Sequence, residues 1–140
     1  MILLDTNVVS EIMRPRPEPL VSSWLDEQPE EELWTASIVI AELLSGVDLM
    51  PNGRKQRALR EAIEGMVAED FRGQILKFDV QAARNYGQIF SDRKRKGRPI
   101  TEMDALIAAT AKTAGATLAT RNIADFEHCG IPLVNPWEAA

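Results

Sequence analysis

The sequence predicts an α/β domain built around a mostly parallel sheet. The main reason is that short apolar runs alternate with longer segments of helical periodicity. The length of 140 residues is that of one ordinary domain, 1–140. An apolar content of 45% and a charged content of 26% are typical of a globular chain that folds without a disulfide or a metal.

Five short segments have the composition of buried strands: residues 2–5, 33–36, 75–78, 117–120 and 132–135. Asp5 ends the first of them, where an apolar run stops abruptly at a carboxylate. In α/β sheets, ligands bind outside the carboxyl ends of the strands, near the point where the strand order reverses. We therefore expect Asp5 at the functional edge of the sheet.

Helical periodicity fills the intervening segments, which are residues 19–28, 37–50, 54–71, 79–97 and 100–115. In the first helix one face is apolar and is formed by Leu20, Val21, Trp24 and Leu25. Ser37 and Asp79 are predicted N-caps, and Gly97 is a predicted helix stop. The proline-rich segment 14–19 and the turn at 51–53 separate the early elements.

Charge and composition limit the classes of function. The formal net charge of −5 argues against a protein that coats nucleic acid by bulk electrostatics. Basic residues nevertheless cluster at 93–98, and acidic residues cluster at 26–32. Cys129 is the single cysteine, and no apolar stretch approaches a membrane span or a signal peptide. We expect a cytoplasmic protein that does not associate with membranes.

Four positions set polar side chains against apolar neighbours. Asp5 follows the first strand, and Glu42 lies within the apolar run 38–44. Asp104 opens an alanine-rich helix, and Asn122 follows the predicted strand 117–120. A charged carboxylate in such surroundings is costly unless it is paired, binds a metal or faces a cleft. A parallel sheet would bring these oxygen atoms to one rim.

Oxygen ligands of this kind suit Mg²⁺ or Mn²⁺. Carboxylates gathered without a cation repel one another, and a divalent ion removes that conflict. The ion can also polarise a phosphoryl oxygen and lower the pKa of a bound water. Hydrolysis of a phosphodiester is therefore the reaction that this set of residues favours.

The chain resembles the PIN-domain ribonucleases, in particular the VapC-like and FitB-like toxins of type II toxin–antitoxin systems. The resemblance rests on motifs that occur in order across nearly the whole chain: "LLDTN" at 3–7, "AEL" at 41–43, "DALIAATA" at 104–111, "TRNIADF" at 120–126 and "IPLVNPW" at 131–137. It implies a single three-layer PIN domain, in which helices flank a central parallel five-stranded sheet. It also implies endoribonuclease activity that depends on Mg²⁺ or Mn²⁺ and leaves a 5′-phosphate and a 3′-hydroxyl.

By the same resemblance, the acidic core and metal ligands are Asp5, Glu42 and Asp104. The fourth acidic position of the family falls on Asn122, which weakens any expectation of a full second metal site. Three further residues would surround the site: Thr6 and Asn7 would support the first acid, and Thr120 would line the pocket. Asp125 is interpreted as a helix cap or as a group that supports the metal ligands without binding the metal itself.

The resemblance further implies a small DNA-binding antitoxin that covers the groove beside the acids and inserts a basic side chain. We expect a homodimer, with the apolar helices between residues 20 and 50 as candidate surfaces, and a larger hetero-oligomer with the antitoxin. The substrate would be RNA. The sequence does not identify the RNA target, the cut site, the antitoxin or the number of metal ions.

Each candidate residue also has a simpler interpretation. Asp5 can end a strand by accepting backbone N–H bonds, and Thr101 with Asp104 fits a capping box. Asn122 can be a turn residue. The basic run 93–98 can be a solvated helix end or a contact for RNA phosphates. The three tryptophans are interpreted as core or interface aromatics: Trp24, Trp34 and Trp137.

Two other functions compete with the nuclease. A non-catalytic PIN-like module could bind RNA or an antitoxin without cutting, which the asparagine at position 122 would allow. A phosphotransfer domain would phosphorylate Asp5, but Asn7 stands where the haloacid-dehalogenase pattern requires a second aspartate. His128 is the only histidine, and no serine or cysteine has a convincing base beside it, which argues against a Ser–His–Asp or Cys–His mechanism.

Overall fold

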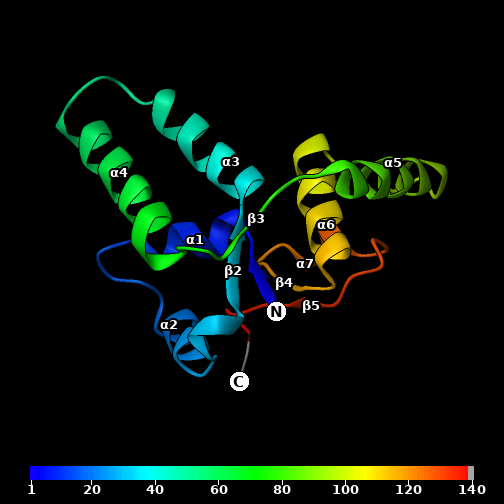
Figure 1. The fold of residues 1–140 in the computed structure, drawn as a ribbon, viewed down its shortest axis with the longest axis horizontal. Coiled ribbons are helices and arrows are strands. Elements are labelled where there is room, and N and C mark those ends of the chain that lie inside the picture. The colour runs from blue at the N-terminus through cyan, green and yellow to red at the C-terminus, as the bar shows by residue number, and fades with distance from the viewer. Residues whose placement is uncertain (139–140) are drawn as a thin grey trace.

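A central five-stranded sheet with helices on both faces forms the core of the molecule, as the computed structural model of residues 1–138 shows (Figure 1). The strand order is β3-β2-β1-β4-β5, and every neighbouring pair is parallel. The strands are β1 (Ile2–Leu4), β2 (Leu33–Ala36), β3 (Ile75–Leu76), β4 (Thr117–Ala119) and β5 (Leu133–Val134). All five predicted strands are confirmed, to within two residues at each end.

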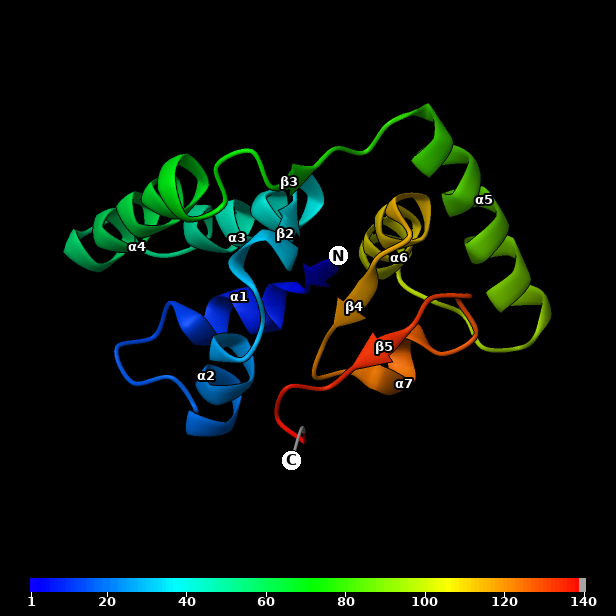
Figure 2. The ribbon, with the colours of Figure 1, turned by 60° about the horizontal axis from the view of Figure 1, so that its bottom comes forward.

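In the described residues 1–138, seven α-helices surround the sheet: α1 (Thr6–Ile12), α2 (Pro19–Asp26), α3 (Ser37–Asp48), α4 (Arg54–Gly65), α5 (Val80–Arg95), α6 (Glu102–Ala114) and α7 (Ile123–Phe126). Helices α3 and α4 lie on one side of the strands, whereas α5 and α6 lie on the other (Figure 2). This arrangement confirms the three-layer α/β prediction. Within residues 1–138, no helix combines the length and the apolar character needed to cross a membrane.

The point where the strand order reverses lies beside β1. The chain builds β1, β2 and β3 outward, and then returns to place β4 on the other side of β1. Leu3 and Leu4 are fully buried because β1 is the central strand. The carboxyl ends of β1 and β4 are therefore neighbours at the edge where ligands bind in open α/β sheets.

Several local predictions differ from the structure. The sequence suggested no helix at 6–12, because Thr, Asn, Val and Ser favour helices weakly, yet α1 forms there. Ser37 is the first helical residue rather than a cap, and Leu20 is 47% exposed rather than facing the core. The predicted helix 54–71 changes at Met66 into the π-helical segment η2 (Met66–Asp70). The N-cap at Asp79 is confirmed, and so is the helix stop at Gly97, which follows the C-cap residue Lys96 with a left-handed φ of 70°.

Candidate active site at the carboxyl edge of the sheet

Asp5 lies at the reversal point, directly after β1. Its backbone N–H donates to the carbonyl oxygen of Ala119 in β4 at 2.9 Å, which fixes it between two strands. Its carboxylate Oδ1 accepts from the backbone N–H of Thr6 at 2.8 Å and so caps α1, with only 4% of the residue exposed. The simpler interpretation of Asp5, that its carboxylate ends the strand by accepting a backbone N–H bond, is therefore also correct. The buried hydroxyl of Thr6 has no hydrogen-bond partner within residues 1–138.

The second carboxylate oxygen of Asp5 is held by two side chains. Its Oδ2 accepts from Thr120 Oγ1 at 2.7 Å and from Asn7 Nδ2 at 3.1 Å. Asn7 Oδ1 in turn accepts from the backbone N–H of Arg121, and Thr120 Oγ1 accepts from that of Asn122, both at 3.1 Å. These bonds join α1 to the segment after β4 and fix the orientation of the carboxylate.

Asp104 lies in the first turn of α6, which Thr101 caps. The hydroxyl of Thr101 accepts from the backbone N–H of Asp104 at 3.2 Å. A capping box would also need the Thr101 N–H to donate to the Asp104 carboxylate, and that bond does not form within the described residues. Thr101 thus stabilises the helix start, and the carboxylate of Asp104 is not used by the cap.

Glu42 lies in the second turn of α3 and is half-buried. With Thr6 it lines a largely apolar cleft of about 470 Å³ between α1, α3 and α4. The apolar residues of this cleft include Leu43, Val47 and Ile63. A carboxylate at such a wall is only partly hydrated, which is costly unless a charged partner or ligand compensates. Glu42 therefore faces a cleft, which is one of the situations in which a carboxylate among apolar neighbours is tolerated.

The environment of Asp5 favours its neutral form. Burial raises the pKa of Asp5, and the negative charge of Glu42 raises this pKa further. Hydrogen bonds from Thr120, Thr6 and Asn7 act in the opposite direction because they stabilise the carboxylate. The net pKa is above the ordinary value for aspartate.

Asp104 is affected in the same way. Burial raises the pKa of Asp104, and the carboxylates of Asp5, Asp125 and Glu42 raise it further, whereas Thr101 lowers it. The three candidate acids therefore interact electrostatically, although Asp5 follows β1, Glu42 lies in the second turn of α3 and Asp104 lies in the first turn of α6. The chain places them in one region of negative charge at the carboxyl edge of the sheet.

The donors in this region are chemically suited to a hard divalent cation. They are carboxylate, hydroxyl and amide oxygens, the groups that Mg²⁺ and Mn²⁺ prefer, and the buried hydroxyl of Thr6 has no hydrogen-bond partner in the part of the chain that the structure describes. Within residues 1–138, no three His, Cys, Asp or Glu side chains are gathered closely enough to hold an ion.

Asn122 and Asp125 lie beside this region in or near α7. Asn122 is exposed at the N-terminal end of α7, and its side chain does not cap the helix. Asp125 lies inside α7 and not at its cap position, so the helix-cap interpretation of Asp125 is wrong. Its charge nevertheless raises the pKa of Asp104, which places Asp125 near the acids.

Arg93 corrects the interpretation of the basic run. The residue is 5% exposed, so it is neither a solvated helix end nor available to RNA. Its guanidinium donates to three backbone carbonyl oxygens, those of Arg98 at 2.6 Å, Asp125 at 2.8 Å and Glu127 at 3.0 Å. Sequence reasoning missed this role because a basic run does not indicate which of its members turns inward.

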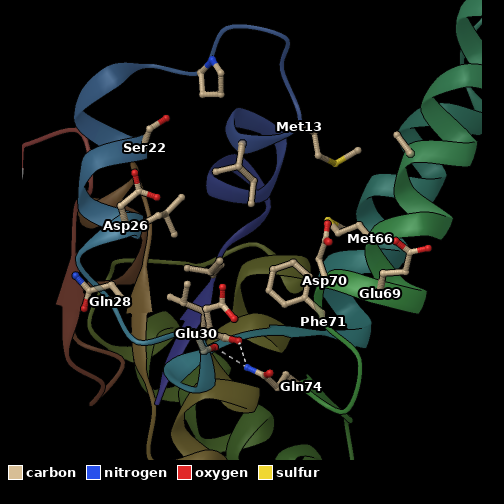
Figure 3. Close-up of a pocket in the computed structure, with 16 residues that line it drawn as sticks. Met13, Ser22, Asp26, Gln28, Glu30, Met66, Glu69, Asp70, Phe71 and Gln74 are labelled. Carbon is tan, nitrogen blue, oxygen red and sulfur yellow. Dashed lines mark hydrogen bonds between the residues drawn. The ribbon is translucent and has the colours of Figure 1, made fainter.

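A hollow of about 940 Å³ lies away from the acids, between α1, α2 and η2 (Figure 3). None of the three candidate acids lines it. Its wall combines apolar groups, including Met13, Met66 and Phe71, with four carboxylates, those of Asp26, Glu30, Glu69 and Asp70. No basic side chain is among the residues that line it, so this hollow does not suit a nucleic acid.

The chain is similar to known proteins over nearly its full length. The family model of the PIN domain matches residues 2–130. VapC ribonuclease Y4jK of Sinorhizobium fredii is 39% identical over 140 residues, which cover 100% of both chains. Toxin FitB of Neisseria gonorrhoeae is 44% identical over 137 residues, which cover 98% of this chain and 99% of the toxin. A chain in the structure of FitAB bound to an IR36 DNA fragment has a TM-score of 0.90 and 42% identity, with 100% of this chain and 98% of that chain covered.

Proposed function

We propose, from the premise that this chain belongs to the PIN-domain family, that it is a metal-dependent endoribonuclease and the toxin of a type II toxin–antitoxin pair. The observation that carries the proposal is the position of Asp5. It is a buried carboxylate at the reversal point of a parallel sheet, held by Asn7 and Thr120 and influenced by Glu42. Relatives of similar length are named a ribonuclease and a toxin.

Asp5, Glu42 and Asp104 would hold Mg²⁺ or Mn²⁺. When bound, the cation supplies charge neutralisation and Lewis acidity for hydrolysis of a phosphodiester. Thr120 and Asn7 orient Asp5 by donating to its Oδ2. Asn122 is exposed at the rim, where its amide can bind water or substrate without adding negative charge.

The partner would be a small DNA-binding antitoxin, consistent with the DNA in the similar FitAB structure. The apolar cleft beside Glu42 can accept an apolar segment of that partner, since Leu43, Val47 and Ile63 line it. A basic side chain from the same segment would then neutralise the acids. We also propose a homodimer and a larger hetero-oligomer with the antitoxin, with the exposed Leu20 and Leu49 as candidate contacts. The pair would act in the cytoplasm.

The test is cleavage of RNA by the purified chain in Mg²⁺. We expect cleavage that EDTA abolishes and Mg²⁺ or Mn²⁺ restores. Asp5→Asn should lower the rate by at least about 100-fold, because electrostatic stabilisation of the transition state is commonly worth that much. Asp92→Asn is the matched control, since Asp92 is an exposed aspartate in α5, and it should cleave at the wild-type rate.

Two results would contradict the nuclease proposal. Cleavage that persists in EDTA would exclude the metal requirement. Tight RNA binding without products, in Mg²⁺ and in Mn²⁺, would favour the rival proposal of a non-catalytic binding module.

A further inference from the structure

A cavity of about 440 Å³ lies where the loop after α1 meets the segments that follow β4 and β5. Three arginines line it, Arg14, Arg16 and Arg121, together with Trp137. The chain returns toward α2 after β5, which brings Trp137 to this place (Figure 2). Two carboxylates, those of Glu11 and Glu18, also line the cavity, so the three guanidinium groups leave it with an excess of one positive charge in a chain whose net charge is −5.

This Arg–Trp cavity is connected to the acids. The backbone N–H of Arg121 donates to Asn7 Oδ1 at 3.1 Å, and Asn7 Nδ2 donates to Asp5 Oδ2 at 3.1 Å. Two hydrogen bonds through Asn7 therefore join Arg121, which lines the cavity, to the buried carboxylate of Asp5. Helix α1 starts at the acid and spans seven residues, or about 10 Å, before the loop that carries the other two arginines. A short stretch of a single RNA strand can span this distance.

The loop that carries Arg14 is held in place by hydrogen bonds to Glu11. Glu11 is buried and accepts from the backbone N–H of Glu18 at 3.1 Å, and from Arg14 Nη1 at 3.4 Å. The bond to Arg14 is long, and the side chain of Arg14 is 66% exposed, so most of its donors remain available. Arg16 is exposed and makes no side-chain hydrogen bond within residues 1–138.

Arg121 and Trp137 form a platform. The guanidinium carbon of Arg121 lies 5.0 Å from the centroid of the Trp137 ring, which is a cation–π arrangement. The backbone N–H of Trp137 donates to Asn135 Oδ1 at 2.9 Å and fixes this segment. RNA bases stack on aromatic rings and on guanidinium planes, and guanidinium groups bind phosphates through paired N–H bonds.

The other charged regions fit RNA less well. The large hollow beside α2 is lined by four carboxylates, and Arg93 of the basic run is buried. The remaining basic residues of that run lie at the end of α5, across α7 and β5 from α2 (Figure 2). The Arg–Trp cavity thus combines an excess of positive charge, an aromatic surface and a connection to Asp5 through Asn7.

We infer that the Arg–Trp cavity binds the RNA strand beside the cleavage site. Arg14, Arg16 and Arg121 bind successive phosphates, and one base stacks on the Arg121–Trp137 pair. Trp137 then has a role in substrate binding, beyond that of the core or interface aromatic expected from the sequence. This inference rests on the proposed function, because it takes RNA as the ligand.

The test measures the affinity of the full chain for a short, fluorescently labelled single-stranded RNA, by anisotropy in EDTA so that no cleavage occurs. The combined variant Arg14→Ala, Arg16→Ala, Arg121→Ala should bind at least about tenfold more weakly. The slope of log affinity against log salt should fall by about 2, the value for three phosphate contacts on a single strand. The backbone N–H of Arg121 remains in this variant, so its bond to Asn7 is retained.

The matched control is the variant Lys94→Ala, Arg95→Ala, Lys96→Ala, which removes the same charge from the basic run. It should change the affinity less than about twofold. Trp137→Leu should weaken binding about tenfold with an unchanged salt slope, because stacking carries no charge. The inference would be overturned if both triple variants lost the same affinity for RNA, or if the control lost more. It would also be overturned if the variant Arg14→Ala, Arg16→Ala, Arg121→Ala bound RNA with wild-type affinity. Urea unfolding of each variant separates these effects from loss of folding.

Cleavage assays distinguish this inference from the proposed function. If the wild type cleaves RNA in Mg²⁺ and the arginine variant has an unchanged KM, the inference fails and the nuclease proposal stands. If the wild type binds RNA through these arginines but never cleaves it, the nuclease proposal fails and the binding site stands.

Discussion

Asp5 and Asp104 have environments that oppose their charge at neutral pH. Burial and neighbouring carboxylates raise the pKa of each, and the hydrogen bonds they receive offset this only in part. A core designed only for stability would contain a neutral residue at either position. The carboxylates are kept at a cost in folding free energy, which a function that needs negative charge at this edge would explain.

This cost leads to a prediction for Asp104→Asn. A pKa that is raised in the folded state means that the native protein binds the proton more tightly than the unfolded chain does. Stability from this group is therefore highest below its unfolded pKa, near 3.8, and is lost as the pH rises through the folded pKa. At neutral pH the variant should be more stable than the wild type, by up to about 1 kcal/mol for a partly exposed charge.

Glu102→Gln is the control for Asp104→Asn. Both changes remove a negative charge from the first turn of α6, and so both lose the same favourable interaction with the helix dipole. Glu102 is exposed, whereas Asp104 is half-buried and lies near the other acids, whose charges raise its pKa in addition to the effect of burial. Urea unfolding between about pH 4 and pH 7 should show a difference between the two variants that grows with pH. A difference that is constant with pH would contradict the electrostatic explanation.

Helix α7 is held in position by a side chain from another element. It has only four residues, too few to be stable by itself. Arg93 of α5 donates to carbonyl oxygens of Asp125 and Glu127, at the end of α7 and just after it. Within the described residues no carboxylate pairs with this buried guanidinium, so these bonds satisfy it instead.

Replacing Arg93 should therefore destabilise the protein. Arg93→Met fills similar space but leaves three carbonyl oxygens without their charged donor, and it should cost about 2–3 kcal/mol in the free energy of unfolding. Arg95→Met removes an exposed arginine from the same helix and should cost less than about 0.5 kcal/mol. Urea denaturation of both variants measures the difference. Equal costs would show that the buried bonds contribute little.

The elements differ in how far the sequence predicts them. The strands and long helices are predicted because their apolar periodicity reflects burial directly. Helix α1 was missed because Asp5 and the sheet stabilise a segment of weak helical propensity. The change from α4 to η2 at Met66 has no counterpart in the apolar pattern, since Ile63 and Met66 are both buried at helical spacing.

At the scale of the whole molecule, the region of the acids was predictable because parallel strands share one carboxyl edge. Asp5 follows β1 and Glu42 lies on the helix that follows β2, so this topology brings both to the same edge, and the charges of both raise the pKa of Asp104 in α6. The Arg–Trp cavity was not predictable, because it joins a loop after α1 to the C-terminal segment. Its residues belong to no common pattern in the sequence. Contacts of that kind depend on tertiary packing.

The whole molecule should respond to the cation that the proposed site holds. An ion that binds only the folded chain stabilises it by mass action, by about 2.7 kcal/mol at 100 times its Kd. Burial is the main cause of the raised pKa of Asp5 and Asp104, and neighbouring carboxylates add to it; a bound Mg²⁺ would offset that added repulsion, so the acids should draw together when it binds.

We therefore predict that Mg²⁺ raises the Tm of the wild-type chain, by about 3 °C for each kcal/mol at this chain length. Asp5→Asn should lose most of this increase, whereas Asp92→Asn should keep it, because Asp92 lies in α5 and pairs with Arg95. Thermal unfolding monitored by circular dichroism, with Na⁺ added to equal ionic strength as the reference, measures the effect without any substrate. An equal rise in Tm for all three proteins would mean that Mg²⁺ acts through general screening of a chain with net charge −5, and the acids would then not form a specific site.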